Sequence, residues 1–244
     1  MDSDRVKEII DDVDPSGRPD IKIIQRGPAT GPRLGVFASS FNPPTIAHVE
    51  LIQRAARAFS LDEILALAGK TNADKLDYEC SLEHRLAMLT LAFAAEPNVS
   101  IGLSSHAFYV DLIDSLRRAY PAQTDLHFIV GFDTFERVLD LEDRYTGRYY
   151  REFGKRTEAL SYLFANSSLI VAGRLGAGLQ NVTQLVECEP VVPSDRVFYL
   201  DVPADLGELS ATGARKRRRE GQSINELVPA TVENYIREHG LYTT

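Results

Sequence analysis

The feature that most constrains the fold is a regular alternation of short apolar segments with longer amphipathic ones after residue 32. In the amphipathic segment 45–59, Ile46, Val49 and Ile52 recur at the spacing of one helix face. Strands and helices that alternate in this way form parallel βαβ units with right-handed crossovers. We therefore predict an α/β fold with helices on both faces of a parallel sheet. The predicted strands are 33–38, 63–68, 99–103, 126–131, 167–174 and 197–202, and the predicted helices are 45–59, 81–95, 109–119 and 223–242.

Residues 1–32 do not follow this alternation, and we expect them to form an appendage and linker to a domain spanning 33–244. Segment 2–13 can form one short helix, which the Pro- and Gly-containing segment 15–20 breaks. The short apolar segment 21–25 is a candidate edge strand, and a Gly- and Pro-rich linker follows it.

Composition narrows the class of protein. A net charge of -8 over 244 residues argues against a nucleic-acid-binding face, because such faces are basic. Small phosphorylated ligands are compatible with this charge, since they need only a few local cations. No apolar run reaches the roughly 18 residues of a membrane span, and the charged N-terminus is not a signal peptide.

The two cysteines, Cys80 and Cys188, lack the spacing of a metal or redox motif. Together with the charged N-terminus, this predicts a reduced, soluble, cytoplasmic protein without nucleic-acid or membrane partners. A homo-oligomer is compatible with the sequence.

The first of three polar clusters is SSFNPPTIAH, residues 39–48, directly after the first predicted strand. A plain strand-to-helix turn needs about two to six residues and no such chemistry. Thr45 and His48 lie three positions apart, so both reach the same side of the following helix. The N–H groups and partial positive charge of a helix N-terminus suit a phosphate. Two interpretations remain open: a phosphate site, or a capping Thr45 beside a half-buried surface histidine.

The other two clusters also follow predicted strands. Gly131 and Asp133 come after the fourth strand, where a carboxylate can accept hydrogen bonds from ribose hydroxyls or can cap the next helix. Ser210, Thr212 and Arg215 surround a helix start, and Thr212 and Arg215 can face one anion. Ligands of a doubly wound sheet bind beyond the carboxyl ends of its strands. Three such clusters therefore fit one nucleotide site.

The remaining polar features are individually ambiguous. Lys70 and Lys75 follow the second strand and can reach a phosphate, and Arg85 in the next helix can bind one bidentately, although each is more often a surface residue. We interpret the basic run 215–219 as a solvated helix face. The charged and aromatic segment 140–158 interrupts the alternation, either as a solvated excursion or as a lid.

These motifs resemble the signatures of a known family. SSFNPPTIAH resembles the nucleotidyltransferase signature G-[ST]-F-[DN]-P-x-[HT]-x-x-H, LSATGAR resembles the second signature I-S-S-T-x-x-R, and HFIVGFD is similar to the G-x-D segment. SLIVAGRLGAGL and the C-terminal GQSINELVPATVENYIREHGLY resemble the nicotinate/nicotinamide mononucleotide adenylyltransferases. The resemblance covers residues 34–242 in matching order and leaves 1–32 outside.

The resemblance implies a Rossmann-like fold and an enzyme of NAD biosynthesis that transfers AMP from ATP to nicotinate or nicotinamide mononucleotide, releasing pyrophosphate. It implies a catalytic group of His48, Thr45 and Arg215, with Thr45 in the place of the family's first histidine. Mg²⁺ would be held mainly by the triphosphate, without a dedicated protein metal site. The residues implied to bind ATP are Ser39, Ser40, Phe41, Asn42, Thr45, His48, Gly131, Asp133, Ser210, Thr212 and Arg215, and those implied to bind the acceptor are Ser40, Lys75 and Arg85.

The chemistry of the residues agrees with this activity. Phosphoryl-type transfer needs positioning and charge neutralisation more than a covalent nucleophile. The chain has no nucleophile elbow and no evident general-base pair, but it has a histidine and cations next to predicted helix N-termini. His48 need only donate a hydrogen bond to the α-phosphate as negative charge builds there.

Departures from the family pattern leave alternatives open. Ser39 stands where the family has Gly, and Ala211 replaces a usual Ser. The family's Trp segment after G-x-D, which helps to bind the pyridine ring, has no counterpart, because the chain has no Trp. Candidate aromatic substitutes are Tyr145, Tyr149, Tyr150 and Phe153. The alternatives are a nucleotidyltransferase that uses another phosphorylated acceptor or CTP, and an inactive nucleotide-binding homologue.

Overall fold

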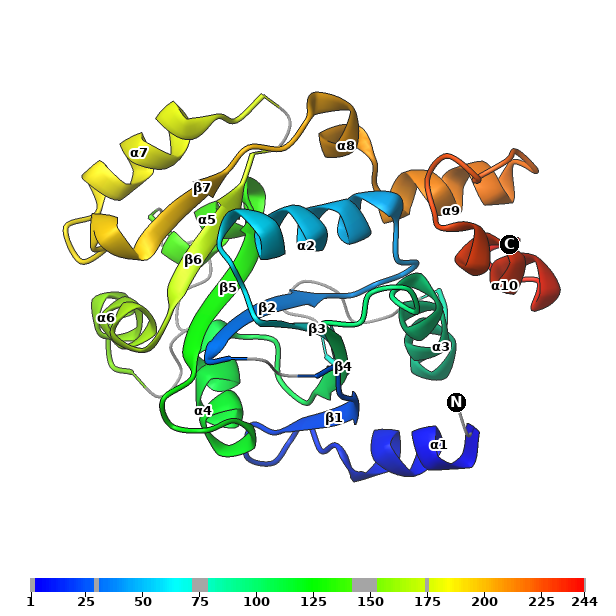
Figure 1. Ribbon diagram of the computed structural model, residues 1–244, viewed down its shortest axis with the longest axis horizontal. Coiled ribbons are helices and arrows are strands. Elements are labelled where there is room, and N and C mark those ends of the chain that lie inside the picture. Colours follow the sequence, from blue (N-terminus) through cyan, green and yellow to red (C-terminus); the bar gives the residue numbers. More distant parts are fainter. Residues whose placement is uncertain (1–2, 29–30, 72–78, 142–152, 174–175, 244) are drawn as a thin grey trace.

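The computed structural model describes residues 3–28, 31–71, 79–141, 153–173 and 176–243. In these ranges seven strands form one sheet in the order β1-β4-β3-β2-β5-β6-β7 (Figure 1). Strands β2 to β7 pair in parallel, and β1 pairs antiparallel with β4. The predicted parallel sheet is confirmed. The strands are β1 Ile21–Gln25, β2 Arg33–Ser39, β3 Glu63–Gly69, β4 Val99–Ser104, β5 Asp125–Gly131, β6 Ser168–Ala172 and β7 Val197–Leu200.

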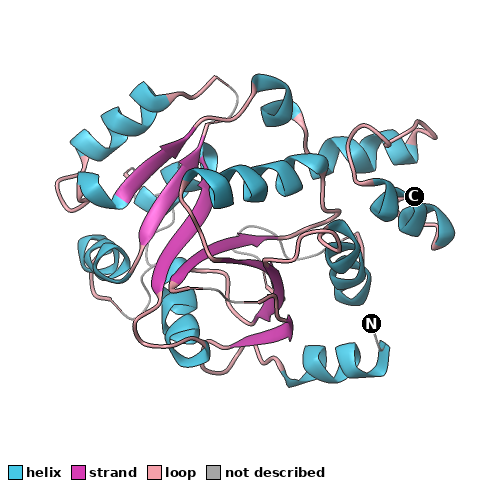
Figure 2. Cartoon of the chain, viewed as in Figure 1, coloured by secondary structure: helices cyan, strands magenta, loops and turns pink. Residues whose placement is uncertain are grey.

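Helices cover both faces of the sheet (Figure 2). Successive side chains of a strand point to opposite faces, and β3 shows the result: Ile64 and Ala66 join one core cluster, whereas Leu65 and Leu67 join the other. Helices α1, α2, α3, α9 and α10 contribute to the first cluster, and α4 to α7 contribute to the second. The helices are α1 Ser3–Asp12, α2 Ile46–Ala58, α3 Leu82–Ala92, α4 Tyr109–Ala119, α5 Phe132–Leu139, α6 Arg156–Asn166, α7 Leu179–Cys188, α8 Ala204–Glu208, α9 Ala211–Arg219 and α10 Ala230–Glu238, with a 3₁₀ turn at Ser194–Arg196.

The N-terminal segment belongs to the same core and sheet as the rest of the chain. Val6, Ile10 and Val13 are buried in the first core cluster. The expected edge strand at 21–25 is confirmed as β1, which pairs with β4. In the described part of 1–32, where we expected an appendage, α1 packs its apolar face against the domain and β1 pairs with the sheet.

Two segment boundaries differ from those that the sequence pattern predicts. The C-terminal segment 223–242 is helical only from Ala230, since Pro229 is the N-cap of α10. Helix α6 begins at Arg156, inside the irregular segment expected at 140–158. Of the candidate aromatic substitutes, Tyr145, Tyr149 and Tyr150 lie outside the described residues, and the Phe153 ring packs 5.2 Å from that of Tyr162.

The order of the strands places a crevice at the centre of the sheet. Strand β2 lies between β3 and β5, so the connections that leave β2 and β5 run to opposite sides. In open α/β sheets, ligands bind at such a switch point, beyond the carboxyl ends of the strands. Within the described residues, no helix is long and apolar enough to cross a membrane.

Candidate active site

A cleft of about 560 Å³ opens at this switch point, and all three polar clusters of the sequence contribute to it. Its walls come from the end of β2, the start of α2, the β5–α5 junction and the segment from 202 to 215. The predicted site residues that line it are Ser39, Ser40, Thr45, His48, Gly131, Asp133, Ser210, Thr212 and Arg215. The clusters that lie far apart in the sequence therefore meet around one cavity.

Thr45 and His48 form a hydrogen-bonded pair at the start of α2. The Thr45 backbone N–H donates to His48 Nδ1 at 2.8 Å, and Thr45 Oγ1 lies 2.8 Å from the same nitrogen. An amide N–H can only donate, so Nδ1 accepts and Nε2 carries the ring hydrogen. The rings of Phe37 and Phe41 lie 5.7 and 5.3 Å from the imidazole and restrict its orientation. The cleft thus presents a histidine whose donor nitrogen is determined by its own helix cap.

Phe41 and Asn42, which we expected on the nucleotide, are buried and are not among the described residues that line the cleft. Phe41 has a left-handed backbone (φ 45°), uncommon for an aromatic residue, and its side chain is fully buried. The Asn42 side chain is also buried and accepts a hydrogen bond from the Tyr242 hydroxyl at 2.6 Å. Burial raises the pKa of Tyr242, which keeps this hydroxyl protonated as a donor. Both buried residues therefore support the loop after β2 without lining the cleft.

Arg215 joins the loop after β2 to helix α9. Its Nη1 donates to the Asn42 carbonyl at 2.6 Å, and its Nη2 lies 3.4 Å from Thr212 Oγ1. Its Nε donates to a carboxylate oxygen of Glu79 at 2.9 Å. Helix α9 begins where the sequence predicts, with Ser210 as N-cap accepting from the Gly213 N–H at 3.0 Å.

Two other predicted cations do not line the cleft. Arg85 is only 2% exposed and donates to the carbonyls of Ser40 at 2.9 Å and Gly69 at 3.4 Å. Its guanidinium therefore stabilises the backbone at the ends of β2 and β3. Lys70 donates to two carbonyls at the C-terminal end of α1. The possible phosphate role of Lys70 is therefore replaced by a helix-capping role. Lys75 lies outside the described residues.

Gly131 and Asp133 mark the start of α5. Gly131, not Asp133, is the N-cap, and Asp133 lies in the first turn. A Cβ at Gly131 would lie 2.9 Å from Asp133 Oδ1, so a larger residue there would crowd the carboxylate. Arg137 Nη2 lies 3.7 Å from Asp133 Oδ2, and both residues line the cleft. Sequence reasoning missed Arg137, although its position four residues after Asp133 places it on the same helix face.

Other lining residues that the sequence analysis did not single out lie at the start of α4 and at the end of β6. Tyr109 begins α4, Ala172 ends β6, and Gly173 follows β6 directly. The available signal was their position near the end of the predicted strand 167–174 and at the start of the predicted helix 109–119. The apolar wall near β7 comes from Val202, Leu206 and Leu209.

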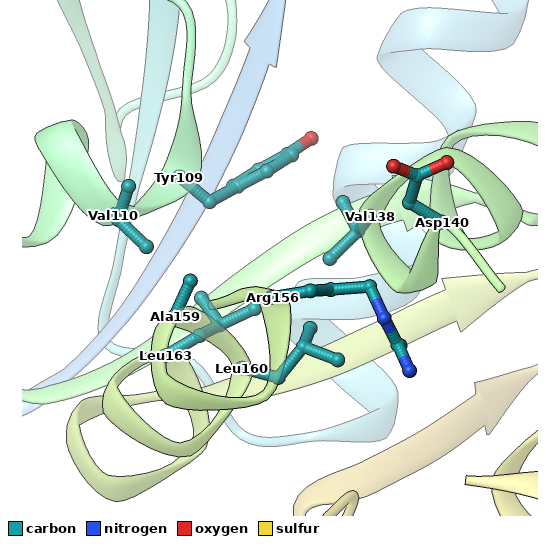
Figure 3. Close-up of a pocket in the computed structure, with 8 residues that line it drawn as sticks. All are labelled: Tyr109, Val110, Val138, Asp140, Arg156, Ala159, Leu160 and Leu163. Carbon is teal, nitrogen blue, oxygen red and sulfur yellow. The ribbon is translucent and has the colours of Figure 1, made fainter. Parts of the chain in front are cut away.

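A much smaller pocket lies on the α6 side of Tyr109 and is lined by side chains from α4, α5 and α6 (Figure 3). Arg156 borders it and is held by Glu189 at 2.6 Å and by the Leu139 carbonyl at 2.8 Å. The volume of this pocket, about 20 Å³, is close to that needed for one water molecule. This pocket is therefore too small for a substrate group.

Known proteins share both the sequence pattern and the fold. A cytidylyltransferase-like family model matches residues 36–156. A protein of Gemmatimonas aurantiaca named "Probable nicotinate-nucleotide adenylyltransferase" is 30% identical over 219 residues, which cover 86% of this chain and 92% of that protein. A protein of the same name from Moorella thermoacetica is 27% identical, covering 86% of this chain and 91% of that protein.

The fold is also similar to that of a solved structure, a Plasmodium falciparum nicotinic acid mononucleotide adenylyltransferase complexed with NaAD. The TM-score is 0.65 with 17% sequence identity, covering 87% of this chain and 98% of that chain. At this identity the similarity concerns the fold, and it agrees with the observed sheet and its helices.

Proposed function

The chain belongs to the nicotinate-nucleotide adenylyltransferase family, and from this we propose that it transfers AMP from ATP to a pyridine mononucleotide, with nicotinate mononucleotide as the first acceptor to test. An oxygen of the acceptor phosphate forms a bond to the α-phosphorus of ATP. The bond from that phosphorus to the bridging oxygen of the β-phosphate breaks, and pyrophosphate leaves.

One observation carries the proposal: three clusters from distant parts of the sequence line a single cleft at the switch point. Among its described residues, the cleft contains one histidine, two arginines (Arg137 and Arg215) and the N-termini of α2 and α9, whose N-cap residues Thr45 and Ser210 carry hydroxyls. Such groups neutralise and orient phosphates, which is most of what adenylyl transfer requires.

His48 is proposed to stabilise the transition state. Since its Nδ1 accepts from the Thr45 N–H, its Nε2–H is the donor for an α-phosphate oxygen. The hydrogen bond strengthens as negative charge develops on that oxygen. No proton need leave His48 during the step.

The other lining residues divide between the phosphates and the ribose. Arg215, Ser210 and Thr212 surround the N-terminus of α9, which suits the β- and γ-phosphates. Asp133 is the one carboxylate among the described residues that line the cleft, and it suits a ribose hydroxyl. Ser39 and Ser40 line the cleft directly, whereas Arg85 acts through the Ser40 carbonyl.

Mg²⁺ would accompany the triphosphate. The cleft fits this arrangement, because its described residues offer cations and hydroxyls rather than a cage of carboxylates. The ion would neutralise part of the phosphate charge, while the protein residues orient the phosphate oxygens. Lys75 as an acceptor contact, the cytoplasmic location and a homo-oligomeric state stay predictions.

The experiment is a pyrophosphate-release assay with ATP or CTP against nicotinate mononucleotide, nicotinamide mononucleotide and other phosphorylated acceptors. We expect turnover with ATP and a pyridine mononucleotide. Turnover only with CTP or with a different acceptor would support the alternative transferase. A protein that binds ATP but releases no pyrophosphate with any acceptor would be an inactive homologue, and the proposal would be wrong.

A further inference from the structure

We propose that Glu79 is a positioning residue that holds the Arg215 guanidinium in the orientation that binds the triphosphate. Glu79 lies outside the three clusters, and it is not one of the described residues that line the cleft. The inference rests on the proposed function for the identity of the ligand, a nucleoside triphosphate.

The contacts of Arg215 show what Glu79 adds. A guanidinium has five N–H donors in a rigid plane. Its Nε donates to Glu79 Oε1 at 2.9 Å, its Nη1 to the Asn42 carbonyl at 2.6 Å and its Nη2 to Thr212 Oγ1 at 3.4 Å. One hydrogen on each terminal nitrogen is left for a ligand. Because the group is planar, the Nε contact sets the direction of both remaining hydrogens.

Burial makes this contact more consequential than a surface ion pair. The Arg215 side chain is 9% exposed, and the Glu79 side chain is 42% exposed. An exposed pair contributes little because water screens it. A buried guanidinium needs an anion or full hydrogen bonding in the absence of ligand, or it will reorient or lose stability. Glu79 supplies that anion.

The carboxylate is itself held from a second side. Arg219 Nη1 donates to Glu79 Oε2 at 2.6 Å, four residues after Arg215 on the same face of α9. Glu79 thus connects to α9 across 136 residues of sequence. Arg219 belongs to the basic run 215–219, which we interpreted as a solvated helix face. In the structure Arg219 forms an ion pair with Glu79.

The negative charge of Glu79 allows the experiment to separate two effects of this residue on ATP affinity. A carboxylate near a triphosphate site repels the ligand, so any gain in ATP affinity must come from orienting Arg215 rather than from charge. Glu79→Gln keeps an oxygen that can accept from Arg215 Nε but removes the charge. Glu79→Ala removes both. The two variants therefore separate orientation from electrostatics.

ATP affinity is measured by calorimetry, together with steady-state kinetics for both substrates and the thermal midpoint. We expect Glu79→Ala to raise Kd and KM for ATP by about tenfold, the effect of one lost charge-assisted hydrogen bond. KM for the mononucleotide should change less than about twofold, and Glu79→Gln should restore ATP affinity to within about threefold of wild type. The matched control is Glu220→Ala, which removes an exposed carboxylate at the C-terminal end of α9 and should change ATP affinity less than about threefold.

Three results would overturn the inference: wild-type ATP affinity in Glu79→Ala, equal losses in Glu79→Gln and Glu79→Ala, or equal changes in KM for both substrates. If Glu79→Ala fails to fold, Glu79→Asp replaces it, because the shorter side chain cannot keep both arginine contacts and should weaken ATP binding similarly. The binding measurement does not need turnover. An inactive wild type would therefore overturn the proposed function while the test of Glu79 continues.

Discussion

At the scale of single residues, the geometry of the pair Thr45 and His48 is compatible with both interpretations that the sequence leaves open. Thr45 is the N-cap of α2, as the capping interpretation requires, and both side chains also line the cleft. The two roles are compatible because the bond from the Thr45 N–H occupies only Nδ1 of the imidazole. The cap thereby selects the tautomer that presents Nε2–H as a donor.

His48→Ala is expected to lower kcat while ATP still binds. Removing one preorganised donor to a developing charge costs on the order of 2–4 kcal/mol, or about 10² to 10³ in kcat. Steady-state kinetics and ATP calorimetry check this, with His239→Ala as the control, because His239 is the exposed C-cap residue of α10. Unchanged kcat would remove His48 from the mechanism.

At the scale of elements, the end of β3 holds the N-terminal helix in place. Lys70, directly after β3, donates to the Ile10 carbonyl at 2.6 Å and to the Val13 carbonyl at 2.7 Å. These are carbonyls at the C-terminal end of α1, which lack partners within the helix and carry its partial negative charge. A cation there joins α1 to the sheet that carries the site.

Lys70→Ala is expected to lower the free energy of unfolding by about 1–2 kcal/mol, because two carbonyls lose a charged donor. ATP affinity should stay within about twofold of wild type, since Lys70 does not line the cleft. Urea denaturation and calorimetry measure the two quantities. Lys7→Ala, an exposed lysine of α1, is the matched control. A large loss of ATP affinity without loss of stability would support the phosphate role instead.

At the scale of the whole molecule, two buried tyrosines connect distant parts of the chain. The Tyr242 hydroxyl joins the C-terminus to the loop of the cleft through Asn42. The Tyr120 hydroxyl donates to Glu63 at 2.9 Å, at the amino end of β3. Burial raises the pKa of both hydroxyls, and the charge of Glu63 adds to the effect at Tyr120.

These shifts predict that stability falls as pH rises above about 10, the ordinary tyrosine pKa. The unfolded chain releases both protons there, while the folded protein keeps them, so ionisation favours unfolding. Each tyrosine contributes a slope of up to about 1.4 kcal/mol per pH unit. Urea denaturation at roughly pH 9 to 11 should show the fall, and Tyr120→Phe and Tyr242→Phe should each reduce it. A slope equal to that of wild type in both variants would contradict the prediction.

The sequence was sufficient for the sheet and for most of the residues that meet at the cleft. Short continuous apolar segments predict the described strands, because the strands of a parallel sheet are buried on both faces. The three clusters were recognisable because the carboxyl ends of such strands meet at one edge. Local spacing did not predict which side chains of this region are buried. Phe41, Asn42 and Arg85 are buried, and Arg85 contacts the Ser40 backbone carbonyl.

What the sequence determined by itself is the α/β alternation, the three clusters and their chemistry, since these depend on local spacing and residue type. Only the tertiary structure decided that α1 and β1 join the main core and that Lys70 caps α1. It also paired Glu79 with Arg215 and Arg219, and Tyr242 with Asn42. These contacts join residues 57 to 200 positions apart. Local spacing contains no information on such pairs, because packing of the whole chain brings them together.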